Sequence, residues 1–260
     1  MQHVAENDRL RVDGVVLKLS DVLILRGVSL AVEPAQTVGL LGANGSGKSS
    51  LLNVISGYYR PNAGSVRLDG VDLVGWSPAR IAASRVGRSF QSIGRMEDLT
   101  VLENVMLGLE PVWQARGLAT VLGLRSSRRA EAEARQRASE IIAEFDLSAY
   151  QDRLLSACPY GVRKVADLLR AMVSSPRLLL LDEPTSGVST EDRHYILELI
   201  RAWTARTSCS TVVVDHDIEF VTALAHAVVA LVGGAVAASG GVAEVLSDEQ
   251  VMATFVGSTK

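Results

Sequence analysis

Apolar residues recur along this chain with two different periods, which predict both strands and helices. Residues 37–41, 178–181 and 210–214 are nearly continuous apolar runs, typical of strands in a parallel sheet covered on both faces. Residues 28–33 alternate apolar and polar side chains, and residues 15–20, 65–70 and 86–90 are further strand candidates. Helices are predicted from Ser49, from Ser77 with Pro78 in the first turn, and over 190–205. The pattern indicates an α/β fold with a parallel central sheet.

The middle of the chain is helical in pattern, over residues 99–109 and 128–145. The apolar residues of the second helix fall on one stripe: Ala130, Ala134, Ala138, Ile141 and Phe145. The opposite face predicts two ion pairs between residues four apart, Glu131–Arg135 and Glu133–Arg137. Residues 117–124, between the helices, are apolar and expected to be irregular. We expect this block to be a helical insertion into the α/β core.

The residues after the strand at 37–41 have the spacing of a phosphate-binding loop, G-x-x-x-x-G-K-[ST]. They are Gly42, Ala43, Asn44, Gly45, Ser46, Gly47, Lys48 and Ser49. Such glycines let backbone N–H groups turn inward and form an anion site at a helix N-terminus, to which we also assign Ser50. Lys48 can then reach the β- and γ-phosphates of a nucleotide, and the Ser49 hydroxyl can bind Mg²⁺. The alternative, a glycine-rich turn with an unrelated lysine, leaves the filled motif and its strand–helix context unexplained.

Charged residues follow two of the buried strands. Asp182 and Glu183 follow the leucines at 178–181, and Asp215-His216-Asp217 follow the strand at 210–214. Because the carboxyl ends of parallel strands meet at one edge of a sheet, we expect Asp182 and Glu183 to lie beside the phosphate loop, at the end of the neighbouring strand.

Composition argues against several classes of protein. The net charge of −3 does not fit a general nucleic-acid binder, and we expect no nucleic-acid partner. Cys158 and Cys209 are too few and too far apart for a disulfide framework or a zinc site, which favours a reducing cytoplasm. The polar residues 1–11 lack the apolar core of a signal peptide.

One stretch is long enough to cross a membrane, since residues 220–243 contain no Asp, Glu, Lys or Arg. However, His226 lies within it, and Gly233-Gly234 and Gly240-Gly241 interrupt it. We therefore expect a buried hairpin with strands at 228–232 and 235–238, and any membrane role must come through a partner.

The motifs, in this order, resemble the ATP-binding subunit of an ABC transporter over nearly the whole chain. Arg88-Ser89-Phe90-Gln91, residues 99–105, the helical insertion and residues 251–257 are most similar to the branched-chain amino-acid uptake ATPases. The resemblance implies a P-loop NTPase core with a parallel central sheet, an N-terminal antiparallel β subdomain and a helical insertion. It places the core at about 1–91 and 165–260, and the helical subdomain at about 92–164.

The resemblance also implies ATP and Mg²⁺ as cofactors and gives each site residue a role. Ser49 and Gln91 would hold Mg²⁺, and Asp182 would bind in the metal's outer shell. Glu183 would orient or deprotonate the attacking water, and His216 would hydrogen-bond the γ-phosphate. Taken alone, a glutamine at a strand end is usually a surface amide, and a histidine after a strand is usually structural. We assign roles to Gln91 and His216 because of their order in the chain relative to the phosphate loop and the two acidic residues.

The chain departs from the family pattern at sites that contact nucleotide. The family's adenine-stacking aromatic residue is replaced by Leu19, which keeps an apolar contact and loses about 1 kcal/mol of stacking. The family signature, which contacts the nucleotide of the opposite subunit, usually reads Leu-Ser-Gly/Tyr-Gly-Gln. Residues 158–162 here read Cys-Pro-Tyr-Gly-Val, which keeps Tyr160 and Gly161. Pro159 has neither a hydroxyl nor an N–H group.

A further departure lies after the acidic pair, where Ser189 replaces an Asp or Asn. Ser189 and Asp192 form the pattern of a capping box at a helix start. Two explanations stay open: the subfamily tolerates Leu19, Pro159, Val162 and Ser189, or one site of a mixed dimer is slow.

The leading hypothesis is an ATPase subunit, peripheral on the cytoplasmic face of the plasma membrane, that energises an importer of branched-chain or other amino acids. Its partners would be integral-membrane permease subunits, a second ATPase subunit, identical or different, and indirectly an external solute-binding protein. Gln91 and the segment to about Leu109 would carry the γ-phosphate state to the permease. The alternatives are an ABC ATPase for another cargo, such as urea or an exported lipid, and a soluble ABC-type switch acting on ribosomes or DNA. Such switches usually carry two cassettes, whereas this chain has one phosphate loop.

Overall fold

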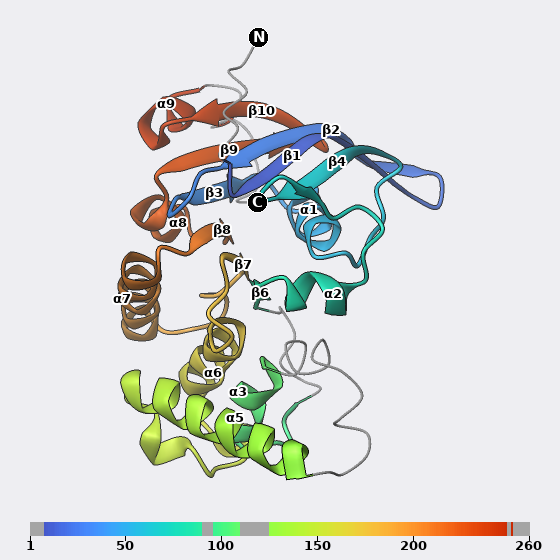
Figure 1. The fold of residues 1–260 in the computed structure, drawn as a ribbon. Coiled ribbons are helices and arrows are strands. Elements are labelled where there is room, and N and C mark those ends of the chain that lie inside the picture. The colour runs from blue at the N-terminus through green and yellow to red at the C-terminus, as the bar shows by residue number, and fades with distance from the viewer. Residues whose placement is uncertain (1–7, 90–95, 110–124, 249–250, 252–260) are drawn as a thin grey trace.

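The computed structural model describes residues 8–89, 96–109, 125–248 and 251, and within them the chain forms two sheets and surrounding helices (Figure 1). The smaller sheet is antiparallel with the order β2-β1-β4-β5. Its strands are β1 (Leu10–Leu19), β2 (Val22–Val32), β4 (Ala63–Leu68) and β5 (Val71–Asp72). The expected N-terminal antiparallel subdomain is therefore present.

The larger sheet has the order β10-β9-β3-β8-β7-β6 and is parallel except for β10 at one edge. Its strands are β3 (Thr37–Leu41), β6 (Val86–Arg88), β7 (Leu178–Asp182), β8 (Ser210–Val214), β9 (Ala227–Val232) and β10 (Ala235–Gly240). Every residue of β3, β7 and β8 is buried, as the continuous apolar runs predict.

Helices cover both faces of the larger sheet and form the lower part of the molecule in Figure 1. They are α1 (Lys48–Ile55), α2 (Pro78–Ala83), α3 (Val101–Leu107), α5 (Arg125–Glu144), α6 (Tyr160–Met172), α7 (Thr190–Thr207), α8 (Ile218–Leu224) and α9 (Val242–Leu246). Short 3₁₀ turns occur at Ser148–Tyr150 and Leu155–Ala157.

The leucines of β7 divide between two hydrophobic cores, because successive side chains of a strand point to opposite faces. Leu178 and Leu180 pack with α1 and the antiparallel sheet. Leu179 and Leu181 pack with α6, α7 and α8. The strand that ends at Asp182 is thus fixed from both sides.

The helical block buries the predicted stripe of α5, with Ala134, Ala138 and Ile141 in the core. The predicted pairing of Glu133 with Arg137 is wrong, because Glu133 pairs instead with Arg129 at 3.1 Å. The Arg137 guanidinium donates to the Val173 carbonyl at 2.8 Å and to the Ser175 hydroxyl at 2.7 Å. A charged donor gains more from this tertiary contact with the loop after α6 than from an exposed helical pair.

Two strand predictions were too short. β1 begins at Leu10 and β2 at Val22, and their pairing shifts register between Val12 and Val15, beside Gly14. Gly14 has φ +57°, and a residue in the left-handed region at a β-bulge breaks the period of two that the sequence pattern relies on. The predicted strand at 86–90 ends at Arg88 in the described residues, and Phe90 and Gln91 lie outside them.

The uncharged stretch at 220–243 contains most of α8 together with β9 and β10, so it is not one continuous helix. The predicted hairpin is present. Within the described parts of the chain, none of the helices has both the length and the apolar character to span a bilayer. The expected burial holds only for β9, since β10 is the sheet edge and is partly exposed.

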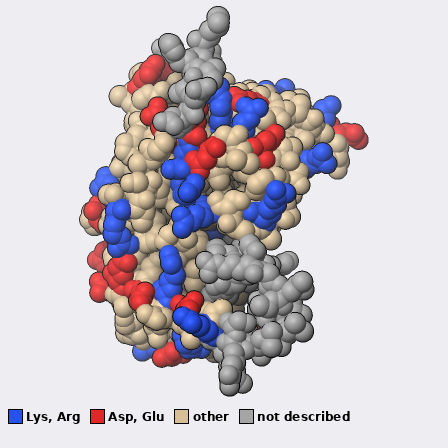
Figure 2. Space-filling model, viewed as in Figure 1, with Lys and Arg blue, Asp and Glu red and all other residues tan. Residues whose placement is uncertain are grey.

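Charged side chains of both signs are interspersed on the face seen in Figure 2. Among the described ion pairs, Arg9 and Arg177 both contact Asp69, and Arg11 contacts Asp13. In these pairs the acidic partners offset the positive charge of the arginines.

Candidate functional site

The phosphate loop occupies residues 42–47, between the end of β3 and the start of α1. Gly47 caps α1 with φ +104° and Gly42 has φ +151°, which L side chains rarely adopt. A Cβ at Gly42 would lie 2.4 Å from the Leu231 carbonyl oxygen and 2.5 Å from the Ser46 Oγ. Close packing against the end of β9 thus requires glycine at position 42, and close packing against β2 requires it at position 47.

Lys48 lies across this loop. Its Nζ donates to the Gly42 carbonyl at 2.7 Å and to the Ala43 carbonyl at 2.9 Å, and burial lowers the pKa of its ammonium. The Ser46 hydroxyl is buried and has no hydrogen-bond partner among the described residues. A cation, the N-terminus of α1 and this spare hydroxyl make the loop fit for a phosphate.

Ser49, the last residue of the motif, contacts the acidic residue that ends β7. Its Oγ donates to Asp182 Oδ1 at 3.3 Å, although the two residues are 133 positions apart. Asp182 is buried, and its other oxygen accepts from Arg88 at 3.2 Å. One expectation needs correction, because β8 lies between β3 and β7, so Asp182 is not on the strand next to the phosphate loop.

Glu183 and His216 meet at the ends of β7 and β8. The His216 Nε2 lies 2.8 Å from Glu183 Oε1, and the Glu183 side chain is 13% exposed, against 48% for His216. The Glu183 backbone has φ +52°, an uncommon conformation that costs about 1 kcal/mol or more for a residue with a side chain. Its N–H donates to the Val214 carbonyl at 2.8 Å, and its carbonyl accepts from the buried Lys164 Nζ at 3.1 Å.

Asp215 holds the turn that follows Glu183. Its Oδ2 accepts from the Thr185 N–H at 2.9 Å and from the Thr185 hydroxyl at 2.7 Å, and all these groups are buried. The sequence placed Asp215 beside His216 and gave it no role. The sequence gave no role to Lys164 and used Arg88 only as part of a family motif, since the partners of both residues are far away in the chain.

The signature residues lie at the start of α6, next to the loop after Glu183. The Tyr160 hydroxyl donates to the Ser186 carbonyl at 3.1 Å, and the residue is 46% exposed. A Cβ at Gly161 would lie 2.6 Å from the Asp192 carboxylate. Ser189 caps α7 and accepts from the Asp192 N–H at 3.1 Å, which confirms the capping interpretation.

Two predicted site residues remain, Leu19 and Gln91. Leu19 is the last residue of β1 and is partly buried against the core of the antiparallel sheet. Gln91 lies outside the described residues.

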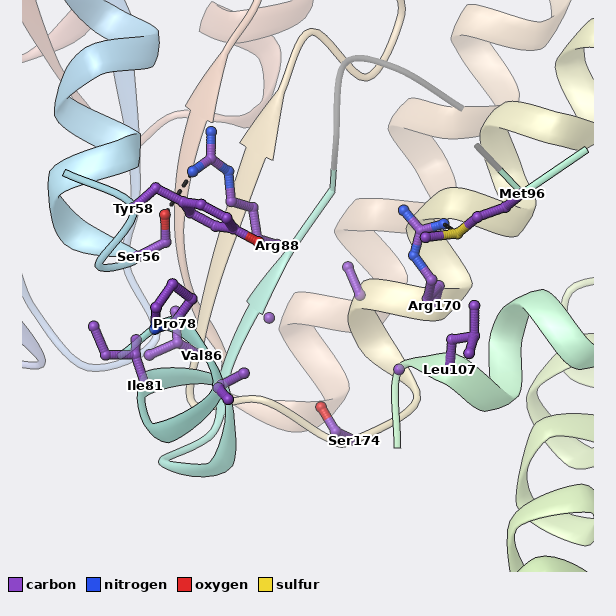
Figure 3. Close-up of a pocket in the computed structure, with 15 residues that line it drawn as sticks. Ser56, Tyr58, Pro78, Ile81, Val86, Arg88, Met96, Leu107, Arg170 and Ser174 are labelled. Carbon is purple, nitrogen blue, oxygen red and sulfur yellow. Dashed lines mark hydrogen bonds between the residues drawn. The ribbon is translucent and has the colours of Figure 1, made fainter. Parts of the chain in front are cut away.

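A pocket of about 380 Å³ opens between α2 and β6 on one side and α3 and α6 on the other (Figure 3). Arg88 and Arg170 come from opposite walls of it. Arg170 donates to Asn104 Oδ1 at 3.0 Å and pairs with Asp167, which fixes α3 to α6. The pocket thus lies where the helical block meets the larger sheet.

The oxygens at the loop fit a magnesium ion. A hydroxyl and a carboxylate face each other there, and Mg²⁺ prefers such hard ligands together with substrate phosphates and waters. Among the described residues there is no group of three or more His, Cys, Asp or Glu that could hold a metal by itself. An ion at Ser49 and Asp182 would therefore take further ligands from nucleotide phosphates and water.

A family model described as ABC transporter matches residues 25–186, which include the phosphate loop, the signature segment and both acids. The chain belongs to the ABC transporter family. Its α/β architecture is that of solved cassettes from this family. A nucleotide-free ATP-binding cassette from an ABC transporter has a TM-score of 0.83 and 25% identity, over 95% of this chain and 98% of that one.

Curated members of the family extend the likeness over nearly the whole length. The high-affinity branched-chain amino acid transport ATP-binding protein BraF of Pseudomonas aeruginosa is 28% identical over 95% of this chain and 97% of its own. The phosphonates import ATP-binding protein PhnC of Chromohalobacter salexigens is 34% identical over 90% of this chain and 84% of its own.

Proposed function

We propose that this chain is the ATP-binding and ATP-hydrolysing subunit of a membrane importer for branched-chain or other amino acids. The observation that carries the proposal is the meeting of three separate motifs at one point. Ser49 of the phosphate loop contacts Asp182, and the adjacent Glu183 contacts His216. A chain that only bound nucleotide would have no need of a carboxylate and an imidazole beside the phosphate loop.

Binding of ATP would use the loop and the start of α1. The Lys48 ammonium would exchange its two carbonyl partners for β- and γ-phosphate oxygens, and the helix N-terminus adds partial positive charge. Ser49, Asp182 and Gln91 would hold Mg²⁺, which when bound neutralises charge on the phosphates. Leu19 would offer the adenine an apolar contact.

Hydrolysis would use the pair at the strand ends. The Glu183 carboxylate would orient the attacking water and accept its proton, and His216 would hydrogen-bond the γ-phosphate. The 2.8 Å contact between these side chains supports the assignment, because both reach the same point near the loop. Lys164 and Asp215 would keep the Glu183 turn in place.

The assembly would contain a second ATPase subunit and integral-membrane permease subunits at the inner face of the plasma membrane. Tyr160 and Gly161 would face the nucleotide of the second subunit. The segment from Gln91 to about Leu109, which includes α3 at the wall of the pocket, would carry the nucleotide state to the permease. An external solute-binding protein would deliver the cargo.

The amino-acid cargo is supported by the likeness to the Pseudomonas aeruginosa protein, which spans nearly the full length of both chains. The phosphonate importer subunit matches at higher identity over less of the chain, so the cassette alone does not select the cargo. The division of the chain into an ATPase core and a helical subdomain at about 92–164 is also part of this proposal.

The test is ATP hydrolysis by the chain purified with its membrane partners and reconstituted in liposomes. We expect Mg²⁺-dependent hydrolysis that rises when solute-binding protein loaded with a branched-chain amino acid is added. Absence of hydrolysis contradicts the ATPase assignment. Capture of ribosomes or DNA in place of membrane proteins contradicts the transport assignment, and stimulation by phosphonate or urea alone contradicts the cargo.

A further inference from the structure

Arg88, at the end of β6, lies between the pocket and the acidic residue of the phosphate site. Its guanidinium donates to Asp182 Oδ2 at 3.2 Å and to Ser56 Oγ at 2.5 Å, and it lies 5.7 Å from the centre of the Tyr58 ring (Figure 3). The Arg88 side chain is 9% exposed and that of Asp182 is 4% exposed. Arg88 and Asp182 thus form a buried ion pair, in which loss of either charge leaves the other without compensation.

This pair determines how the Asp182 carboxylate is presented. Its Oδ2 is held by Arg88, and its Oδ1 faces Ser49 Oγ at 3.3 Å. The Asp182 N–H donates to the Ser89 hydroxyl at 3.1 Å, so the backbone is also fixed. One carboxylate oxygen is therefore committed to the arginine, and the other is directed to the phosphate loop.

Arg88 also places a positive charge beside the oxygens that suit a metal ion. Lys48 and Arg88 are positively charged, and Glu183 and Asp182 are negatively charged. The charges of these four side chains therefore sum to zero. Without the arginine, the other three of these side chains would carry one net negative charge. In such surroundings a charge a few ångströms away changes the attraction of a divalent cation strongly.

We infer that Arg88 is a positioning residue that orients Asp182 and sets how strongly the phosphate site attracts Mg²⁺. The inference rests on the proposed place of Asp182 beside that ion. Arg88 attracts the phosphates of a nucleotide and repels the cation. Removal of its charge is therefore expected to weaken nucleotide binding without Mg²⁺ and to lower the Mg²⁺ concentration at which binding becomes tight.

The experiment titrates mant-ATP against the full chain at Mg²⁺ concentrations from excess chelator to the millimolar range. Arg88→Gln keeps a polar contact with Asp182 and removes the charge, and we expect the Mg²⁺ midpoint to fall about threefold to tenfold. Arg88→Lys keeps the charge and can keep the contact with Asp182, but it cannot also bridge to Ser56, so we expect lower thermal stability and a midpoint within about twofold of wild type. Arg80→Gln is the matched control. Arg80 is an exposed arginine of the neighbouring α2, and its guanidinium lies over the Trp76 ring.

A merely structural arginine predicts a different result. Arg88→Gln would then weaken mant-ATP binding by the same factor at every Mg²⁺ concentration, and this outcome or an unchanged midpoint overturns the inference. If the glutamine variant does not fold, Arg88→Lys decides, because a shifted midpoint with the charge retained also overturns it. If mant-ATP binding to the wild-type chain does not depend on Mg²⁺, the proposed Mg²⁺ site at Ser49 and Asp182 is wrong. That result would contradict the proposed function and not only the inference about Arg88.

Discussion

Lys48 is buried in the phosphate loop, yet its two hydrogen bonds are to carbonyls of that same loop. Its charge therefore contributes little to the rest of the fold. Lys48→Ala is expected to weaken ATP binding by about tenfold to a hundredfold, the cost of one charged hydrogen bond of about 1.5–3 kcal/mol.

The measurement for Lys48→Ala pairs nucleotide affinity with the melting temperature, which we expect to be nearly unchanged. Lys18→Ala, which removes an exposed lysine of β1, is the control for the lost charge. Unchanged ATP affinity would show that the loop does not bind phosphate through this lysine.

Glu183 is the residue proposed to act on water. Glu183→Gln keeps the size and a hydrogen-bonding partner for His216 but cannot accept a proton, so turnover is expected to fall by about a hundredfold or more while ATP still binds. Single-turnover hydrolysis and retention of ATP on the isolated dimer are the measurements. Glu191→Gln, in the exposed first turn of α7, is the control. Near-normal hydrolysis with both sites of the dimer altered removes Glu183 from its role.

At the scale of elements, the site depends on how the ends of β7 and β8 are joined. Asp215 at the end of β8 accepts two hydrogen bonds from Thr185, and Glu183 lies in the turn between β7 and Thr185. The turn contains a residue in the left-handed region, which persists only when neighbouring contacts over-determine it. The two strands therefore present Glu183 and His216 as one unit.

Removal of this junction is expected to lower stability as well as activity. Asp215→Ala leaves both Thr185 donors buried without their acceptor, which is expected to cost about 2–3 kcal/mol in the free energy of unfolding. Asp215→Asn keeps an acceptor and is expected to cost less. Urea unfolding is the measurement, and an alanine variant that unfolds at the wild-type urea concentration contradicts this role of Asp215.

At the scale of the whole molecule, the proposed second subunit would contact residues 158–162 at the start of α6. Pro159 is the N-cap residue of α6 and makes no side-chain capping bond. In the proposed dimer, Pro159 also could not give the hydrogen bond that a serine at this position would give to the opposite γ-phosphate. The site completed by residues 158–162 is therefore expected to be slow, and the site that holds Lys48 to do most of the hydrolysis, if the partner's signature is intact.

Pro159→Ser is expected to raise hydrolysis by the assembled complex, through the partner's site. It is also expected to add about 1 kcal/mol of stability, because serine is a favourable N-cap. The rate of ATP hydrolysis is measured for Pro159→Ser alone and together with Glu183→Gln, which inactivates the site that holds Lys48. A stability gain with no change of rate in either background means that the capping effect is the whole effect and that the asymmetry proposal is wrong.

The sequence alone determined the parts of this protein that depend on neighbours in the chain. The phosphate loop, the caps Ser77 and Ser189, and the buried runs of β3, β7 and β8 follow from spacing and periodicity, because local backbone geometry and burial select those residues. The family followed from the order of these motifs. The roles of Gln91 and Leu19 and the bounds of the helical subdomain stay predictions.

Only the tertiary structure decided which distant groups meet. Three features join residues that no local pattern connects. They are the position of β8 between β3 and β7, the ion pair of Arg88 with Asp182, and the hydrogen bonds from Thr185 to Asp215. The left-handed turn at Glu183 likewise depends on a contact between β7 and β8, the hydrogen bond from its N–H to the Val214 carbonyl. The physical reason is that buried charges and strained turns are stable only where packing brings their partners to them, and packing is a property of the whole chain.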